Sequence, residues 1–303
     1  MGDAVIATNI AREIDGNVVV FANSKYRPLL TNLLGTNSRV QIRGIDLGYT
    51  SRGQGVYFLR DLIQARAINE PFDEVLSIRG DFRDVLLAAK IFRTRHIRCV
   101  GWSGFFLRRI AFLDRLFVVM RGTPLNRYDA WRNITSHLPR LKIMSNEGAR
   151  SPSSNKILIH VGAQWRSKAF PMVSELARRL LTRGYKVTIG YSPGDVEPSD
   201  LPPEAKKIFL DDANTVPEFK SADLIVSNDS SPMHIAGFIG ARNLVLCNLG
   251  NIFEWLPQGA HYLAADDMPE GYRPKVNYMS DQTVDGWPSV DAVVNMIETL
   301  RRP

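Results

Sequence analysis

The stretch ADLIVSNDSSPMHIAGFIGA, residues 222–241, decides the fold. Its first part is an apolar run with the length of a buried strand, and the apolar run after Pro232 has the spacing of a helix. Pro is favoured at the first helical position because its missing N–H costs no hydrogen bond there. We therefore expect a strand that runs into Asp229, a helix that begins at Pro232, and Ser231 as its cap. A strand followed directly by a helix is typical of a parallel α/β sheet.

The start of this helix is a candidate phosphate site. The first N–H groups of a helix have no partner within it, and the helix dipole is positive there. Met233 and His234 are expected to offer such N–H groups to an anion, with the His234 side chain facing the same place. A well-capped helix with a core-facing histidine explains the segment almost as well. These residues alone do not distinguish this structural role from a phosphate site.

The same alternation extends over the whole chain. In the second half ILIHVGA, KVTIGY and NLVLCNL alternate with helical segments, and in the first half NVVVFA, RVQIRGI and FDEVLSI do so. Residues 146–156 are polar and rich in Ser, Gly and Asn, which indicates a linker. A chain of 303 residues exceeds what one core usually organises. The sequence predicts an α/β protein of two doubly wound, Rossmann-like domains, residues 1–150 and 151–303, with ligands at the carboxyl ends of the strands.

A second candidate phosphate loop follows the strand ILIH. Gly162 is small enough to let a ligand approach the backbone, and the loop presents Ser167 and Lys168 before Pro171 opens a helix. Lys168 is suited to neutralise a phosphate as a point charge. A lysine on a loop is usually only solvated. Two such loops at strand ends in one domain nevertheless favour a shared anionic ligand.

The first residues, MGDAVIATNIAREI, place their apolar positions on one helical face, with Gly2 and Asp3 as the entering turn. Taken alone, Asp3 is a helix N-cap.

Charge divides unevenly between the halves. Residues 1–150 carry a net charge of +10, mostly from arginine, whereas residues 151–303 carry −3. Arginine suits bidentate phosphate contacts, so the first half is expected to face an anionic acceptor or a membrane surface. The sequence has no zinc-finger spacing, RNA-binding aromatic signature or dense basic tract, which argues against nucleic acid. Cys99 and Cys247 fit no metal-ligand spacing and indicate structural thiols in a reduced compartment.

No signal peptide and no apolar stretch of membrane-spanning length is present, so we expect a cytoplasmic protein. The nearest approach to a span is residues 105–120, which Arg108 and Arg109 interrupt. This segment is expected either to approach the acceptor or the membrane face, or to be a core helix with capping charges.

Four segments, in order, resemble the family 9 glycosyltransferases, the bacterial ADP-heptose:lipopolysaccharide heptosyltransferases. They are MGDAVIATNIAREI, RGDFRDVLLAAKIF, VGAQWRSKAFP and NDSSPMHIAGFIGA. The resemblance implies the GT-B fold, in which two Rossmann-like domains face each other across a cleft. It also implies a glycosyltransferase that inverts the anomeric centre without a metal. The sequence contains no Asp-x-Asp pair, which fits metal-independent transfer.

By this resemblance Asp3 is the general base and Lys168 stabilises charge on the departing diphosphate. The remaining candidates hold the donor. On one loop these are Gly162 and Ser167, together with Lys168. On the other loop they are Asp229, Ser230, Ser231 and His234. The serines would meet the phosphates, and Asp229 would hold sugar or ribose hydroxyls because a carboxylate repels a diphosphate.

Two features depart from the family pattern. Ser231 replaces the usual glycine of an Asp-Ser-Gly motif, which is expected to stiffen the loop and weaken donor binding. The family begins with a strand before its Gly-Asp turn, whereas this sequence starts at Met1 directly on the turn. We therefore expect the first strand of the acceptor-binding half to be missing, as a start codon assigned too far downstream would explain.

The expected reaction is transfer of a heptose or related sugar from an ADP-sugar, bound by residues 151–303, to a lipopolysaccharide core or another surface glycan. No cofactor is expected beyond this nucleotide-sugar co-substrate, and peripheral contact with the inner membrane is an option. Three alternatives stay open: another nucleotide-hexose donor, a hydrolysing nucleotide-sugar epimerase, and a donor-binding protein without turnover.

Overall fold

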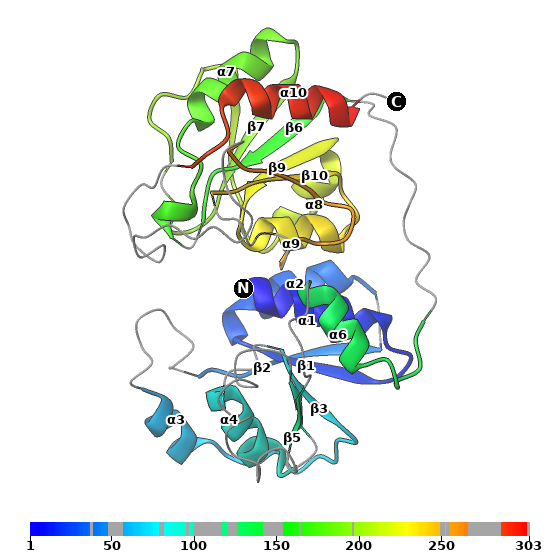
Figure 1. Cartoon of the computed structure of the whole chain (residues 1–303). Coiled ribbons are helices and arrows are strands. Elements are labelled where there is room, and N and C mark those ends of the chain that lie inside the picture. Colours follow the sequence, from blue (N-terminus) through cyan, green and yellow to red (C-terminus); the bar gives the residue numbers. More distant parts are fainter. Residues whose placement is uncertain are drawn as a thin grey trace. The chain divides into compact units, whose positions relative to one another are not determined.

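The computed structural model describes residues 1–36, 39–47, 57–78, 82–94, 97–99, 117–119, 126–141, 154–163, 165–195, 197–248, 252, 255–265 and 286–301. The chain divides into two compact units, which are drawn together in Figure 1. Unit 1 comprises Met1–Asn9, Pro28–Thr36 and Lys142–Pro303, and unit 2 comprises Ile10–Arg27 and Asn37–Leu141. The helices α1 (Gly2–Glu13) and α2 (Arg27–Leu34) each contribute residues to both units.

Unit 1 is built on six parallel strands in the order β11-β10-β9-β6-β7-β8. From β6 the chain proceeds outward through β7 and β8, then crosses back to β9 on the other side of β6. The strand order therefore reverses between β6 and β9, and such a switch point is where α/β sheets bind ligands. The strands are β6 (Lys156–His160), β7 (Lys186–Tyr191), β8 (Lys206–Phe209), β9 (Leu224–Asn228), β10 (Asn243–Leu246) and β11 (His261–Leu263).

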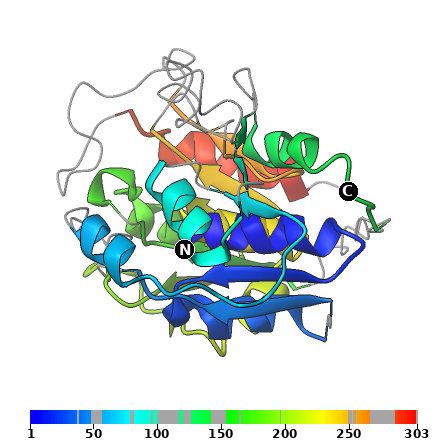
Figure 2. The same ribbon diagram turned by 90° about the horizontal axis from the view of Figure 1, so that it is seen from below.

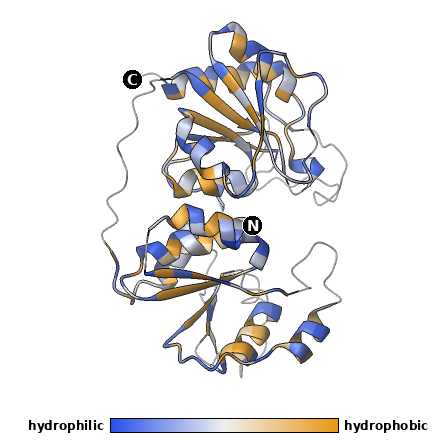
Figure 3. Ribbon diagram, turned by 180° about the vertical axis from the view of Figure 1, so that it is seen from behind, coloured by the Kyte–Doolittle hydropathy of each residue, from blue (hydrophilic) through white to orange (hydrophobic). Residues whose placement is uncertain are grey.

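Helices cover both faces of this sheet, as predicted. Leu244 and Leu246 of β10 belong to the core formed with α7 (Val173–Thr182) and α10 (Val290–Arg301). Val245, whose side chain points to the opposite face, packs with Met233 of α9 (Ser231–Phe238). Figure 3 shows the result as strands that are largely apolar between helices that carry both apolar and polar turns. The helix α8 (Thr215–Ser221) also belongs to this unit.

The helix α7 ends at a glycine. Its last turn is followed by Gly184, which has φ +80°. This left-handed conformation is accessible to glycine at little cost and ends the helix so that β7 can begin two residues later.

Unit 2 holds two parallel sheets, whereas the sequence predicted one. The first pairs β1 (Val18–Ala22) with β2 (Val40–Gly44), and no strand of the described ranges joins it to the second. Phe21 instead packs its ring against Phe72 and Phe92. The second sheet comprises β3 (Val75–Ser77), β4 (Ile97–Cys99) and β5 (Phe117–Val119), and the helices are η1 (Ser24–Tyr26), α3 (Phe58–Gln64), α4 (Phe82–Phe92) and α6 (Arg127–Ile134).

The helices α3 and α4 lie side by side, as Figure 2 shows in light blue and cyan. Lys90 of α4 fixes this arrangement, because its ammonium donates to the main-chain oxygen atoms of Leu62 and Ile63 at the end of α3. In the ranges that the structure describes, no helix is long and apolar enough to cross a membrane.

Candidate functional site

The loops after β6 and β9 lie at the switch point of the unit 1 sheet. The two strands are parallel neighbours, with Ile159 opposite Val226, so their carboxyl ends meet at one edge. The loop after β6 carries Lys168 in the short 3₁₀ helix η5 (Arg166–Lys168), and the loop after β9 carries Asp229. All the predicted donor-binding residues thus come from two adjoining loops.

Lys168 and Asp229 form an ion pair that joins the loops. The Lys168 Nζ atom lies 2.5 Å from the Asp229 Oδ2 atom, and the two side chains are only 19% and 13% exposed. An ion pair with so little solvent is held more firmly than one on the surface. The sequence predicted a site role for each residue but not their contact.

Asn228, the last residue of β9, holds the loop after β6 in place. Its amide nitrogen lies 3.1 Å from the oxygen of Val161 and 3.2 Å from that of Gly162, and its Oδ1 atom accepts from the N–H of Phe170 at 3.0 Å. Asn228 is buried, and it binds the loop on both sides of Lys168. Asn228 was not among the predicted site residues, although a polar amide at the end of an apolar strand was a visible signal.

Replacing Asn228 by alanine is expected to lower the free energy of unfolding by about 3 kcal/mol, since buried main-chain groups of the loop lose their partners. Urea unfolding followed by circular dichroism measures the loss. The matched control is Asn295→Ala on the exposed face of α10, which should change stability little. A loss no larger than that of the control would contradict the bridging role.

The beginning of α9 differs from the prediction in three ways. The helix begins at Ser231, so Pro232 is its second residue and Ser230, not Ser231, occupies the N-cap position. No side-chain cap is made, because the Ser230 hydroxyl lies instead near the oxygen atoms of Gly162 and Asn228. The Met233 N–H donates to the Ser230 oxygen at 3.2 Å, so it is not the free donor that was expected.

His234 lies buried in the first half of α9, close to the ion pair. Burial lowers its pKa to about 4, an effect that Asp229 opposes and that the amino terminus and Lys168 reinforce. The imidazole is therefore neutral at pH 7. The expectation that His234 shares the environment of Lys168 and Asp229 agrees with these mutual electrostatic effects.

The first turn of α1 also reaches this region of unit 1. A Cβ atom on Gly2 would lie 3.1 Å from the Cδ2 atom of His234 and 3.9 Å from the Ser231 Oγ atom, so only glycine fits without displacing the ring. Asp3 follows directly. It lies within the helix, which begins at Gly2, and so the interpretation of Asp3 as an N-cap is wrong.

Gly162 is required by a close contact that the sequence did not predict. A Cβ atom at this position would lie 2.0 Å from the Asp195 carboxylate, which accepts from the Ser192 N–H at 2.8 Å. The Gly162 N–H donates to the Nδ1 atom of His160, which leaves the proton of the buried ring on Nε2, 3.2 Å from the Ser192 hydroxyl. Burial lowers the pKa of His160 to about 4, so this ring is a neutral support for the loop.

Other predicted features lie partly outside the described residues. One is the linker at 146–156, of which only residues 154–156 are described. The other is the segment 105–120, which contains Arg108 and Arg109 and of which only the backbone of 117–119 is described. Cys247 is buried, and its thiol donates to the main-chain oxygen of Leu263 at 3.6 Å. Within the described part of the chain, no group of three or more His, Cys, Asp or Glu side chains is arranged to hold a metal ion.

A family model described as glycosyltransferase family 9 (heptosyltransferase) matches residues 136–247. This range runs from before β6 to the end of β10 and includes both loops with Lys168 and Asp229. Curated protein sequences give no match to the chain.

Solved structures match almost the whole chain. The E. coli ADP-heptose lipopolysaccharide heptosyltransferase II has 19% identity and a TM-score of 0.52, with 99% of this chain and 94% of that chain covered. A family 9 glycosyltransferase from Veillonella parvula DSM 2008 has 17% identity and a TM-score of 0.61, covering 99% and 94%. The E. coli heptosyltransferase WaaC, solved with ADP, has 11% identity and a TM-score of 0.62, covering 98% and 96%.

At these identities the solved structures establish the fold, and the family model identifies the segment that carries the two loops. The predicted α/β fold of the GT-B heptosyltransferases and the predicted enzyme class are confirmed. Residues 136–247 match the model of glycosyltransferase family 9 (heptosyltransferase), and the chain has the fold of the solved heptosyltransferases.

Proposed function

We propose that the chain transfers a heptose or a related sugar from an ADP-sugar to a lipopolysaccharide core or another surface glycan, with inversion and without a metal. The observation that carries this proposal is the nearly buried ion pair of Lys168 and Asp229 at the switch point of the unit 1 sheet. A cation held there, beside the start of α9, suits the diphosphate of a nucleotide sugar. The E. coli relative WaaC, which has the same fold, was solved with ADP, and this supports an adenine nucleotide.

In the proposed reaction an acceptor hydroxyl oxygen attacks the anomeric carbon, whose bond to the β-phosphate oxygen breaks. The hydroxyl proton passes to the Asp3 carboxylate, and the nucleoside diphosphate leaves with the bonding electron pair. Negative charge therefore grows on the leaving oxygen, where the Lys168 ammonium stabilises it most in the transition state.

Asp229 has two roles in this scheme. Its carboxylate holds the Lys168 ammonium in place, at a separation of 2.5 Å between Nζ and Oδ2. When a diphosphate binds the ammonium, its negative charge repels the carboxylate. The carboxylate then accepts hydrogen bonds from hydroxyl groups of the nucleotide sugar. Ser230 and Ser231 contribute to the phosphate site and the neutral ring of His234 adds no charge to it.

The acceptor is expected to bind unit 2 because unit 2 is positively charged. The residues of unit 2 include 21 Lys and Arg against 11 Asp and Glu, a net charge of +10, and lipopolysaccharide cores are anionic. Peripheral contact with the cytoplasmic face of the inner membrane belongs to the same proposal, because the acceptor is a glycolipid.

A thermal-shift panel with ADP-, GDP- and UDP-sugars tests the donor. A ligand at about 100 times its dissociation constant stabilises the native state by roughly 2.7 kcal/mol, so only the correct nucleotide should raise the melting temperature by several degrees. A response to UDP- or GDP-sugars without one to ADP would contradict the proposed donor. Incubation with the donor alone distinguishes a transferase from an epimerase. An epimerase changes the sugar without an acceptor, whereas a transferase leaves the donor nearly intact.

A further inference from the structure

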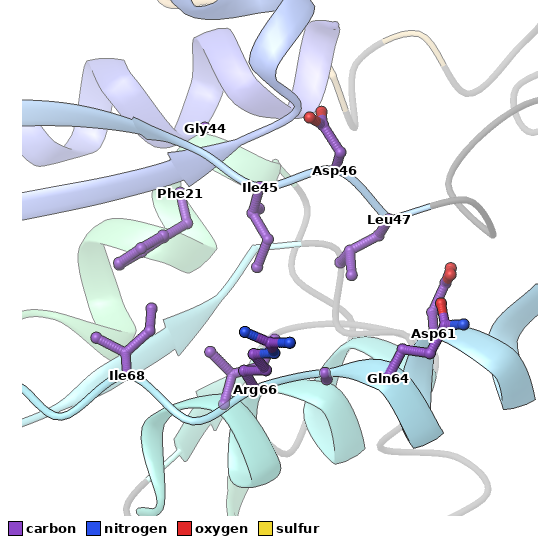
Figure 4. Close-up of a pocket in the computed structure, with 11 residues that line it drawn as sticks. Phe21, Gly44, Ile45, Asp46, Leu47, Asp61, Gln64, Arg66 and Ile68 are labelled. Carbon is purple, nitrogen blue, oxygen red and sulfur yellow. The ribbon is translucent and has the colours of Figure 1, made fainter.

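Unit 2 contains a pocket that includes none of the candidate donor-site residues. It has a volume of about 290 Å³ and is lined by residues of β1, of the segment after β2, of α3 and of α4. Figure 4 shows it between the strand ends and the helices. Phe21 is the penultimate residue of β1 and Gly44 the last of β2, so the pocket opens where the strands end. Open α/β sheets bind their ligands at this end.

One wall of the pocket is apolar. It is formed by Phe21, Ile45, Ile68 and Ile91, and Figure 4 shows Phe21 and Ile45 on the strands with Ile68 facing them from the segment after α3. The volume lies at the lower limit of the range for small-molecule sites, which suits one ring and its substituents. Flat apolar surface of this kind packs against the C–H face of a ring.

The opposite side of the pocket presents three polar groups of different kinds. Figure 4 shows Asp61 and Gln64 next to each other at one end, and the Arg66 guanidinium in the middle. Asp61 is only 7% exposed although it lies in the first turn of a short helix, and the Arg60 guanidinium is 3.5 Å from its Oδ1 atom. A carboxylate, an amide and a guanidinium together accept and donate hydrogen bonds in neighbouring positions.

The charges in the pocket determine which ligands it accepts. Two carboxylates, Asp61 and Asp46, line the pocket together with the Arg66 guanidinium, and Arg60 pairs with Asp61, so the formal charges in and beside the pocket balance. A phosphate or carboxylate would therefore meet the repulsion of the Asp61 carboxylate without an excess of positive charge to offset it. A neutral ring with several hydroxyl groups can donate to Asp61 and Gln64 and accept from Arg66 without such repulsion.

We propose that this pocket binds one neutral sugar ring of the acceptor glycan, with Asp61, Gln64 and Arg66 as the residues that recognise its hydroxyl groups. The assignment to the acceptor rests on the proposed function. The basic surface of unit 2 then attracts the anionic parts of the glycan, while this pocket selects an uncharged residue of it.

Saturation-transfer difference NMR with methyl β-D-glucopyranoside, methyl β-D-galactopyranoside and methyl α-D-mannopyranoside tests the pocket directly. A ligand of this size is expected to bind with a dissociation constant on the order of 1 mM. Gln64→Leu and Arg66→Met should each weaken binding about tenfold, because each removes hydrogen bonds, for Arg66 from a charged donor. Both side chains are exposed, so the variants should fold, and their melting temperatures verify this. Gln258→Leu, at an exposed site in unit 1, is the matched control.

Three outcomes would overturn the proposal. They are equal binding in Gln64→Leu and Gln258→Leu, no signal from any glycoside, and stronger binding of glucose 6-phosphate than of the neutral glycosides. Binding of ADP to the unaltered protein is measured alongside. If ADP does not bind, the proposed function is contradicted, and the NMR result still shows whether the pocket binds a sugar. If ADP binds and the glycosides do not, only the proposal for the pocket is contradicted.

Discussion

Replacing Lys168 by alanine is expected to lower the turnover number at saturating donor by about 10² to 10³, the usual cost of losing one preorganised electrostatic donor. The physical reason is the growth of charge on the leaving diphosphate, which makes the ammonium worth more in the transition state than in the bound donor. The fraction of enzyme with bound donor should fall much less. Initial rates of ADP release at several donor concentrations separate the two effects.

The contact with Asp229 adds a sharper expectation. Without Lys168, the 13% exposed carboxylate of Asp229 has lost its cation and stands beside the diphosphate. Part of any loss in ADP affinity therefore comes from repulsion by Asp229 and not from the missing ammonium. The double variant Lys168→Ala with Asp229→Asn should regain ADP affinity, measured by calorimetry, while turnover stays low.

The control for Lys168 is Lys220→Ala at an exposed position of α8, which removes the same charge away from the site. Its turnover should equal that of the unaltered enzyme within about twofold, as is usual for a screened surface charge. Near-normal turnover of Lys168→Ala itself at saturating donor would mean that this lysine only binds Asp229.

The fold of unit 1 was predictable because most of its strands are short apolar runs and most of them alternate with helices. Gly184 carried its own signal, since a glycine directly after an amphipathic helical segment is typical of a helix end. The first residue of α9 was not predictable, because Pro232 is tolerated anywhere in the first turn and so does not fix the start. In unit 2 the separation of β1 from β3 was not predictable, because strand pairing is a tertiary property that no local pattern encodes.

The candidate site was predictable as a set of residues but not as a network. Lys168 and Asp229 are 61 positions apart, and their contact follows from the pairing of β6 with β9. Strand order is a tertiary property, so the direct contact of the two side chains was not predictable even though both loops were assigned to one ligand. The supports behind the loops, His160 and Asn228, were missed because a buried polar side chain at a strand end is recognised only when its main-chain partners are known.

Replacing Asp3 by asparagine is expected to abolish measurable transfer, with a loss of 10² to 10⁴ or more in turnover, the range that a positioned general base contributes. Asparagine keeps the shape of the side chain but does not take the proton from the acceptor hydroxyl. ADP binding should be unchanged, because in the proposed mechanism the carboxylate meets the acceptor and not the nucleotide. Parallel measurements of transfer rate and of ADP affinity by calorimetry test both statements.

The location of Asp3 makes this the most demanding test of the proposed mechanism. Its neighbour Gly2 approaches His234 so closely that a Cβ atom would be 3.1 Å from the ring, which brings the start of α1 to the candidate donor site. The isosteric control Asp15→Asn removes an exposed carboxylate that pairs with Arg39 and should leave transfer unchanged.

An Asp3→Asn enzyme that transfers sugar at the full rate would exclude Asp3 as the base. His234 is then the next candidate, because its pKa of about 4 keeps the ring neutral and able to accept a proton at pH 7. The variant His234→Gln decides between them: if it abolishes transfer while Asp3→Asn does not, the base is the histidine. If both variants retain activity, the base is a carboxylate elsewhere, and Asp81, which lies outside the described residues, is the one to replace next.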